Sequence, residues 1–464
     1  MTTEAEKISL QDEFEDIIAS GDDNSLRQFL DDQNISDVAD LIYENEDRGA
    51  YILSRLSIHR AAGLFKILEH STQEDIIHKL PPTKTAELLN ELPPDDRTSF
   101  LEDLPNEVVR ELIKTLNPEE RKITLALLGY PENSVGRLMT PDYVYVHENN
   151  TVEEVLNIIR QVGKNSETID VIYVINDKGE LQDDIRIREF ILASSQTKVS
   201  DLMDGRVISL KVNDDQEIAN DVFKMNNRVA LPVTDDKNVL LGIITIDDVL
   251  WIASEEFSED MQKIGGTEAL NEPYLEMPIF KLFKKRVNWL IVLFIGEMFT
   301  ATAMGYFEDE IAKAVVLALF VPLIISSGGN SGSQASSLII QAMAVGELTI
   351  SDWWKVMRRE IISGLMLGGI LGMIGFLRVI LWSNIFPDVY GIHFVAIGLT
   401  VGIALVGVVL WGTLCGSMLP LILKRLGADP AVSSAPFVAT LVDVTGLLIY
   451  FSVAYIFLQG TLLK

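Results

Sequence analysis

Hydrophobic and polar positions divide the chain into two unequal parts. Apolar runs long enough to cross a bilayer occur only after residue 286. Five of them fit the hydropathy, at residues 287–307, 314–343, 361–382, 393–423 and 431–458. The first 280 residues alternate apolar and polar positions at helical or strand spacing. The pattern predicts a large soluble part, with room for two domains, followed by five transmembrane helices.

Prolines punctuate the helical pattern of residues 24–130. Segments of helical character begin at Pro82, Pro94, Pro105 and Pro118, 11 to 13 residues apart. Proline suits the first helical position, and acids in the first turn complement the helix dipole. This repetition predicts an N-terminal α-superhelical domain. Asp95 and Asp96 lie in one such first turn. They could bind a cation, and the alternative is that they only stabilise the helix dipole.

An internal repeat follows in residues 135–256. The segment from Val135 aligns with the one from Val199, and each copy predicts a strand, a helix, an antiparallel strand pair and a helix. This resembles the tandem CBS module, an α/β pair that often binds an adenosine ligand such as ATP. Gly242 and the TIDD run from Thr245 fit that pattern, whereas the first copy has Asp183 and Arg188 at the corresponding places. A dimerising spacer is the alternative role.

Charge separates the two parts further. Residues 281–464 hold 12 basic and 10 acidic residues of the chain's 38 and 67, so the first 280 residues have a net charge of −31. Such acidity argues against nucleic acid or anionic lipid as a partner and favours cations, although plain solubility is the simpler explanation. Cys415, the only cysteine, lies in an apolar segment and excludes an intramolecular disulfide.

The fifth apolar segment contains one charge, Asp443. A carboxylate at mid-membrane costs about 2.5–3.5 kcal/mol on insertion scales, so we expect it to face protein or a water-filled path. Pro436 could loosen the helix before it, and the small Ala439, one turn away, leaves space and could expose a carbonyl. One carboxylate with room for waters suits Mg²⁺. The alternative is a salt bridge to Arg378.

The second apolar segment is irregular between Pro322 and Ser337. Gly328, Gly329 and Gly332 stand among hydroxyl and amide side chains, and the sequence predicts a break in the helix that lines water. Freed carbonyls and Asn330 could then contact a hydrated cation. The alternative is close helix packing through small residues. For Glu297, the other acid inside an apolar segment, we expect a helix–helix hydrogen bond or a protonated state rather than a role in the pore.

An acidic strip precedes the membrane part. Six acids lie on one predicted helix, and four of them, at 255, 256, 259 and 260, share one strip because i, i+4 neighbours face the same side, where they repel one another unless a cation intervenes. The six acids are Asp247, Asp248, Glu255, Glu256, Glu259 and Asp260. A divalent ion that bridges the strip to another acidic surface would relieve the repulsion, and a solvated face is the alternative.

Basic residues set the predicted orientation. Nine of them lie before the first span, between spans two and three, or between spans four and five. The other loops contribute only Lys313. The rule that positive charge stays inside places the N-terminal domains in the cytoplasm and the C-terminus outside. The N-terminus has no signal-peptide pattern. We expect a multi-pass protein of a bacterial-type inner membrane.

Three segments and their order resemble the MgtE family of magnesium channels and transporters over essentially the whole chain. They are GGNSGSQAS at 328–336, PFVATLVD at 436–443 and the linker ending SEDMQKIGG at 258–266. The resemblance implies a homodimer with an ion path lined by spans two and five and Asp443 as the selectivity residue, with Asn330 and the Ala439 carbonyl nearby. It also implies that cytosolic Mg²⁺ bridges the acids of the N-terminal domain, CBS pair and connecting "plug" helix, and so closes the pore.

The expected architecture is therefore multidomain and has four parts. These are an N-terminal α-superhelical domain at 1–132, an α/β tandem CBS domain at 133–250, an acidic plug helix at 251–280 and an all-α five-span transmembrane domain at 281–464. The expected function is Mg²⁺ import down its electrochemical gradient, without enzyme activity. The alternatives are transport of Mn²⁺ or Co²⁺, which the lack of soft ligands disfavours, and a membrane-anchored nucleotide sensor.

Overall fold

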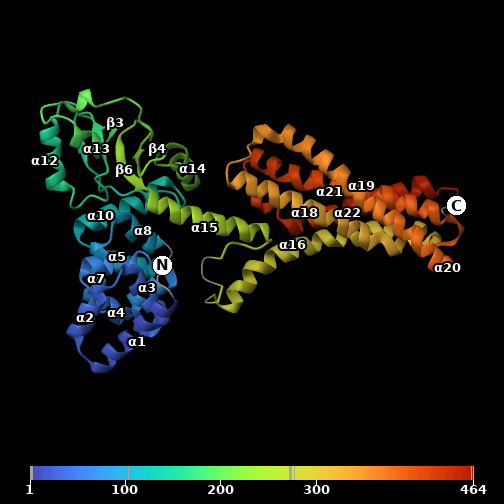
Figure 1. Cartoon of the computed structure of the whole chain (residues 1–464), viewed down its shortest axis with the longest axis horizontal. Helices are drawn as coiled ribbons and strands as arrows, with labels where there is room; N and C mark the ends of the chain where they lie inside the picture. The colour runs from blue at the N-terminus through green and yellow to red at the C-terminus, as the bar shows by residue number, and fades with distance from the viewer. Residues whose placement is uncertain (1–3, 103, 271–273, 276, 461, 463–464) are drawn as a thin grey trace. The chain divides into compact units, whose positions relative to one another are not determined.

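The computed structural model describes residues 4–102, 104–270, 274–275, 277–460 and 462. The chain forms two compact units, residues 1–253 and 254–464, and the division falls within helix α15 (Ile246–Ile264). Figure 1 colours both units by residue number. Each unit is described by itself.

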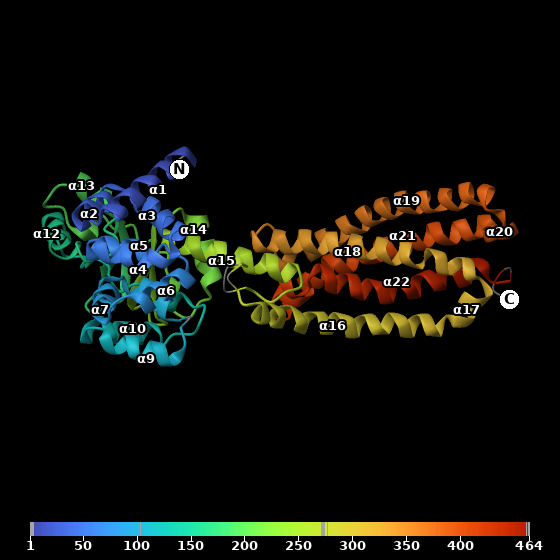
Figure 2. The same ribbon diagram turned by 90° about the horizontal axis from the view of Figure 1, so that it is seen from below.

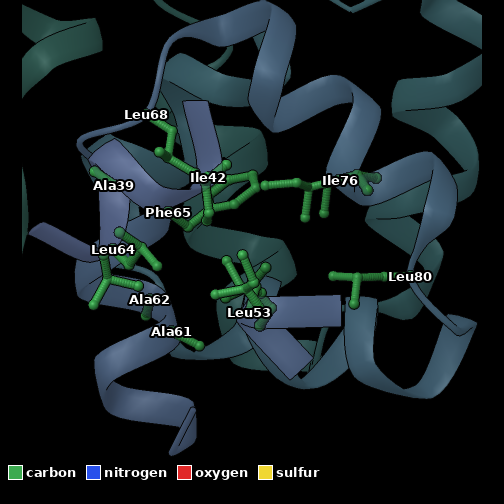
Figure 3. Close-up of a cluster of buried hydrophobic side chains, with 14 of the residues drawn as sticks. Ala39, Ile42, Leu53, Ala61, Ala62, Leu64, Phe65, Leu68, Ile76 and Leu80 are labelled. Atoms are coloured by element: carbon green, nitrogen blue, oxygen red, sulfur yellow. The ribbon is translucent and has the colours of Figure 1, made fainter. Parts of the chain in front are cut away.

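The first unit begins with a stack of short helices around one apolar core. They are α1 (Glu4–Ser20), α2 (Asp23–Asp32), α3 (Ile35–Glu44), α4 (Gly49–Arg55), α5 (Ile58–Phe65), α6 (His70–Lys79), α7 (Pro82–Glu91), α8 (Pro94–Glu102), α9 (Asn106–Thr115) and α10 (Pro118–Leu127). Ile42, Leu53, Phe65 and Ile76 meet at the centre of this core (Figure 3). The proline-started helices are confirmed, with Pro105 capping α9 from just outside it.

Two copies of one α/β motif complete the first unit. The first comprises α11 (Val135–Leu138), β1 (Tyr145–Val146), α12 (Val152–Val162), β2 (Val171–Ile175), β3 (Leu181–Arg186) and α13 (Ile187–Leu192). The second comprises β4 (Leu210–Lys211), α14 (Gln216–Asn226), β5 (Ala230–Thr234), β6 (Leu240–Thr245) and the start of α15. In each, the first strand pairs parallel with the second, which pairs antiparallel with the third. The repeat is confirmed.

The second unit is a bundle of long apolar helices that run side by side (Figure 2). They are α16 (Ile279–Tyr306), α18 (Val321–Ala344), α19 (Trp353–Ile385), α21 (Phe394–Arg425) and α22 (Ala435–Leu458), with the short α17 (Glu308–Lys313) and α20 (Pro387–Tyr390) between them. Five segments are long and apolar enough to cross a membrane. The four-part fold class expected from the sequence is thereby confirmed.

The predicted break in the second span is wrong. Helix α18 is continuous from Val321 to Ala344. Its glycines instead allow close packing: a Cβ on Gly328 would lie 2.5 Å from Val408 Cγ1, and one on Gly332 would lie 2.9 Å from the Gly412 carbonyl oxygen. The small-residue alternative explains this stretch, because glycine lets helix backbones approach closely.

Candidate functional site

Asp443 lies half-buried on α22 beside the backbone of α18. A Cβ added to Gly329 would lie 3.5 Å from Asp443 Oδ1 and 3.5 Å from Ala439 Cβ. The aspartate and the alanine therefore share the face of α22 that meets Gly329, as their spacing predicts. Asn330, the next residue of α18, is exposed. The structure thus brings Asp443 and Ala439, two of the residues expected at the ion path, to Gly329, whereas the Asn330 side chain bonds to Ser326 on its own helix.

Arg378 does not neutralise this carboxylate. Its guanidinium stacks over the ring of Trp382, 4.9 Å from the centroid, one turn along α19. No salt bridge joins Arg378 to Asp443 in the part of the chain that the structure describes. The salt-bridge alternative for Asp443 therefore has no support in the fold.

Two other expectations for this region need correction. Pro436 lies in the first turn of α22, where proline fits, so it does not loosen the helix before Asp443. Because α22 is continuous, the Ala439 carbonyl lies within the helical hydrogen-bond ladder and is not exposed by a break. Gly328 and Gly332 contact α21 and so serve packing, whereas Gly329 faces the aspartate.

Glu297 lies on α16, which packs against the part of α22 that carries Asp443. A Cβ on the preceding Gly296 would lie 2.8 Å from Thr440 Cγ2, one turn from Asp443 on α22. The expected helix–helix hydrogen bond to Glu297 is not among those of the described residues. Glu297 therefore belongs to the surroundings of the candidate ion path.

A second group of acids lies where the N-terminal helices meet the CBS pair in the first unit. We call it the clasp cluster; its carboxylates are Asp95, Asp96, Glu167, Asp247 and Asp248, which interact electrostatically with one another and, apart from Asp95, with the ammonium of Lys66. Lys66 Nζ lies 3.6 Å from Asp96 Oδ2. The sequence pointed to four of these carboxylates, but it missed Glu167 and Lys66, which only the tertiary fold brings near them.

Asp95 is the most constrained member of the clasp cluster. It is 6% exposed, and its Oδ1 atom is buried without a hydrogen-bond partner. Burial and then the charges of Asp248, Asp96 and Glu167 raise the pKa of Asp95 well above its usual value. A first-turn acid that only served the helix dipole would gain nothing from such burial. An orphaned buried carboxylate oxygen among other hard oxygen donors fits a site for Mg²⁺.

Asp248 is oriented by its own motif. The Thr245 hydroxyl donates a 2.6 Å hydrogen bond to Asp248 Oδ2, so the TIDD run holds this carboxylate in place. Burial, together with the charges of Asp247, Asp96 and Glu167 and against the opposing hydrogen bond from Thr245, raises the pKa of Asp248 to about 7. Asp248 is therefore a fixed member of the clasp cluster.

A third acidic group joins α15 to the start of α22 within the second unit. Lys263 pairs with Glu259 one turn earlier and with Asp429, whose Oδ2 lies 2.7 Å from its Nζ. Burial, then the charges of Asp429, Glu256 and Glu259, raise the pKa of Asp260 to about 6, and Lys263 opposes them. Asp429 was missed in the sequence because it is 166 residues from Lys263. Glu255, by contrast, is exposed.

Neither acidic group is a closed metal site in this conformation. Across the described ranges, no three histidine, cysteine, aspartate or glutamate side chains converge to hold a metal ion. Each group instead includes an ammonium that pairs with its carboxylates, Lys66 with Asp96 in the first unit and Lys263 with Glu259 and Asp429 in the second. The donor set suits a hydrated divalent ion, which needs few direct protein ligands.

The two CBS copies differ at the position of the family glycine. A Cβ on Gly242 would lie 2.7 Å from the Thr140 carbonyl oxygen, so glycine is required there. The corresponding Asp183 is 1% exposed and accepts hydrogen bonds from the backbone of Asp184, Asp204 and Gly205. Asp183 therefore has a structural role in place of the glycine, while Arg188 is exposed.

Comparison with known proteins agrees with this arrangement. Family models match in chain order: the MgtE intracellular N domain over residues 33–133, the CBS domain over 135–195 and 199–255, and MgtE, divalent cation transporter, over 321–453. A solved structure of the soluble part of a magnesium transporter aligns with 54% of this chain and 99% of its own length, at 25% identity and a TM-score of 0.51.

Curated relatives extend the match into the membrane part. The magnesium transporter MgtE of Thermus thermophilus is 38% identical over 345 residues, 74% of each chain. That of Enterococcus faecalis is 32% identical over 418 residues, 90% of this chain and 89% of the relative. With its domain order, its five apolar helices and this degree of identity, the chain belongs to the MgtE family of transporters.

Proposed function

We propose that this chain is a Mg²⁺-selective channel that imports Mg²⁺ down its electrochemical gradient. The observation that carries the proposal is Asp443, a half-buried carboxylate beside Gly329 and Ala439, without a basic partner among the described residues. The small neighbours leave space for a hydrated ion, and Asn330, which follows Gly329 on α18, is the proposed polar side chain of the path. A divalent ion that enters at about 100 mV gains about 4.6 kcal/mol from the membrane potential, so transport needs no other energy source.

The acids of the soluble part supply the proposed gate. The clasp cluster and the group around Asp260 both hold several carboxylates whose mutual repulsion a divalent ion would relieve. Cytosolic Mg²⁺ bound there would hold the soluble helices together and close the path, and its loss would release them. The ligands proposed are the clasp-cluster acids and, on α15, Glu256, Glu259 and Asp260, with Asp429 added from the membrane unit.

The remaining features of the proposal concern assembly and placement. Ser326, Asn330 and Gln334 are exposed on a helix long enough to cross a membrane, and lipid contact would be unfavourable for them. A second copy of the chain would cover them, which supports a homodimer with the path between the copies. The asymmetry of basic residues supports an inner membrane with the soluble domains in the cytoplasm and the C-terminus outside. The proposed domains are residues 1–132, 133–250, 251–280 and 281–464.

The CBS pair is the proposed site of an adenosine nucleotide such as ATP. The match to CBS family models supports this ligand class. Because Asp183 and Asp184 already bond to neighbouring backbone and to Arg228, we place the nucleotide at the other half of the pair. Titration of the purified chain with ATP, followed by calorimetry, tests this part separately from transport.

The test of the transport proposal is Asp443→Asn. Removing the charge while keeping the shape should abolish growth rescue of a Mg²⁺-dependent bacterial strain at low external Mg²⁺. Asp309→Asn, an exposed acid of α17, is the matched control and should rescue fully. Rescue by Asp443→Asn would contradict the channel and favour the membrane-anchored sensor. Parallel uptake of Mn²⁺ and Co²⁺ by the wild type tests the choice of ion.

A further inference from the structure

The segment that leads into α22 is held by hydrogen bonds from two neighbouring helices. We call residues 429–435 the α22 anchor. Ser333 and Ser336 of α18 donate to the Ala435 and Ser433 carbonyls at 2.9 and 2.8 Å. Trp289 Nε1 of α16 donates to Ser434 Oγ at 3.2 Å. The start of the helix that carries Asp443 is therefore fixed by its surroundings.

Helix α15 reaches the same anchor through a single ammonium group. Lys263 Nζ lies 2.7 Å from Asp429 Oδ2, and the same lysine pairs with Glu259 on its own helix. Asp429 Oδ1 accepts the Ala431 amide at 2.8 Å, so one carboxylate both caps the anchor and receives the lysine. The side chains of Lys263 and Asp429 are 29% and 36% exposed. Partial burial weakens solvent screening, so this pair is stronger than a surface salt bridge.

The charge around this contact is unbalanced. Glu259, Asp260 and Asp429 carry three negative charges when ionised, and Lys263 carries one positive charge. Two negative charges remain, which one divalent ion would neutralise. Without the ion, the lysine is what opposes repulsion between α15 and the anchor.

We propose that the Lys263–Asp429 ion pair is an autoinhibitory latch that holds α15 against the start of the pore helix without a metal ion. A divalent cation then strengthens a contact that already exists. This inference deepens the proposed function and rests on it, because the latch matters to transport only if α22 lines the ion path. It predicts that the gate retains a closed population when cytosolic Mg²⁺ is removed.

The test compares four variants of the full-length chain with the wild type. Lys263→Met removes the ammonium. The double variant Glu259→Lys/Lys263→Glu, the exchanged pair, keeps the composition and the ion pair within α15. It places a carboxylate instead of an ammonium beside Asp429. Lys263→Arg keeps the charge, and Lys313→Met removes an exposed lysine from another loop. Two readouts are hydrogen exchange of residues 254–264 in chelator and open probability in inside-out patches.

In Lys263→Met and in the exchanged pair, the amides of residues 254–264 should exchange about tenfold faster than in the wild type. Both variants should also open more often in chelator. Lys263→Arg and Lys313→Met should behave as the wild type. Unchanged exchange and currents in both Lys263→Met and the exchanged pair would overturn the latch, as would a failure of Lys263→Arg to retain closure. The two proposals fail separately, since normal currents through Asp443→Asn would remove the pore assignment and leave the exchange result standing.

Discussion

Several charged side chains of this chain are buried. Arg97 is the clearest structural case, with no exposed surface. Its guanidinium donates to Thr124 Oγ1 at 2.9 Å, to the carbonyls of Leu89 and Leu92, and to Glu120. One side chain thereby ties the end of α7 to α8 and α10, beside the acids of the clasp cluster.

Arg97→Met should therefore destabilise the N-terminal helices by about 3 kcal/mol, because it leaves buried acceptors and Glu120 unpaired. Hydrogen exchange of the α8 and α10 amides measures the loss. Lys114→Met, which breaks an exposed pair with Glu111, should change stability by no more than about 0.5 kcal/mol. Equal effects of the two variants would show that burial of Arg97 contributes little.

Some residues of the candidate sites could be found from the sequence, and others could not. Asp443, Asp95 and Asp248 could be proposed as site residues from the sequence because each is an acid in an unusual local pattern. Lys66, Glu167 and Asp429 could not, because their local sequence is ordinary and only the tertiary fold brings them to the other acids.

Elements in the membrane unit are held together by glycines that meet backbone to backbone. A Cβ on Gly416 would lie 2.1 Å from the Gly332 carbonyl oxygen, and one on Gly412 would lie 2.3 Å from that of Gly328. Neither partner is a flexible side chain end, so α18 and α21 must separate to admit even a methyl group. The sequence indicated the length and number of these helices well. It could not distinguish a broken helix from a tightly packed one, because the same small residues serve both.

Gly416→Ala should accordingly lower the stability of the membrane unit by about 1–3 kcal/mol, through overpacking. The reaction of Cys415, the single cysteine, with a thiol-reactive fluorophore during heating reports the unfolding of α21. Gly369→Ala is the matched control, because a Cβ there meets nothing within 4 Å and alanine favours the helix. If both variants unfold at the same temperature as the wild type, the helices are less closely interlocked than the structure indicates.

Across the whole molecule, the acidic soluble part is expected to respond to pH as well as to Mg²⁺. Burial raises the pKa of Asp248 to about 7 and, with neighbouring charges, raises the pKa values of Asp95 and Glu167. Between the ordinary aspartate value near 4 and about 7, the folded unit binds more protons than the unfolded chain. Its stability therefore falls as pH rises through this window, and it is highest on the acid side.

Thermal unfolding of the full chain in chelator should thus occur at a lower temperature at pH 7.5 than at pH 5.5. Added Mg²⁺ should stabilise more at the higher pH, because it need not displace protons. Asp248→Asn should reduce both effects. A transition temperature that rises from pH 5.5 to 7.5 would contradict the burial of these ionised groups.

The interlocked glycines have a consequence for how a gate could move. Helices α18 and α21 touch through their main chains, so sliding one along the other would drive carbonyl oxygens into Cα atoms. Helix α16, in contrast, has no buried residue. If Asp443 lines an ion path, we therefore expect that path to widen through movement of other helices, such as α16, against the closely packed pair of α18 and α21.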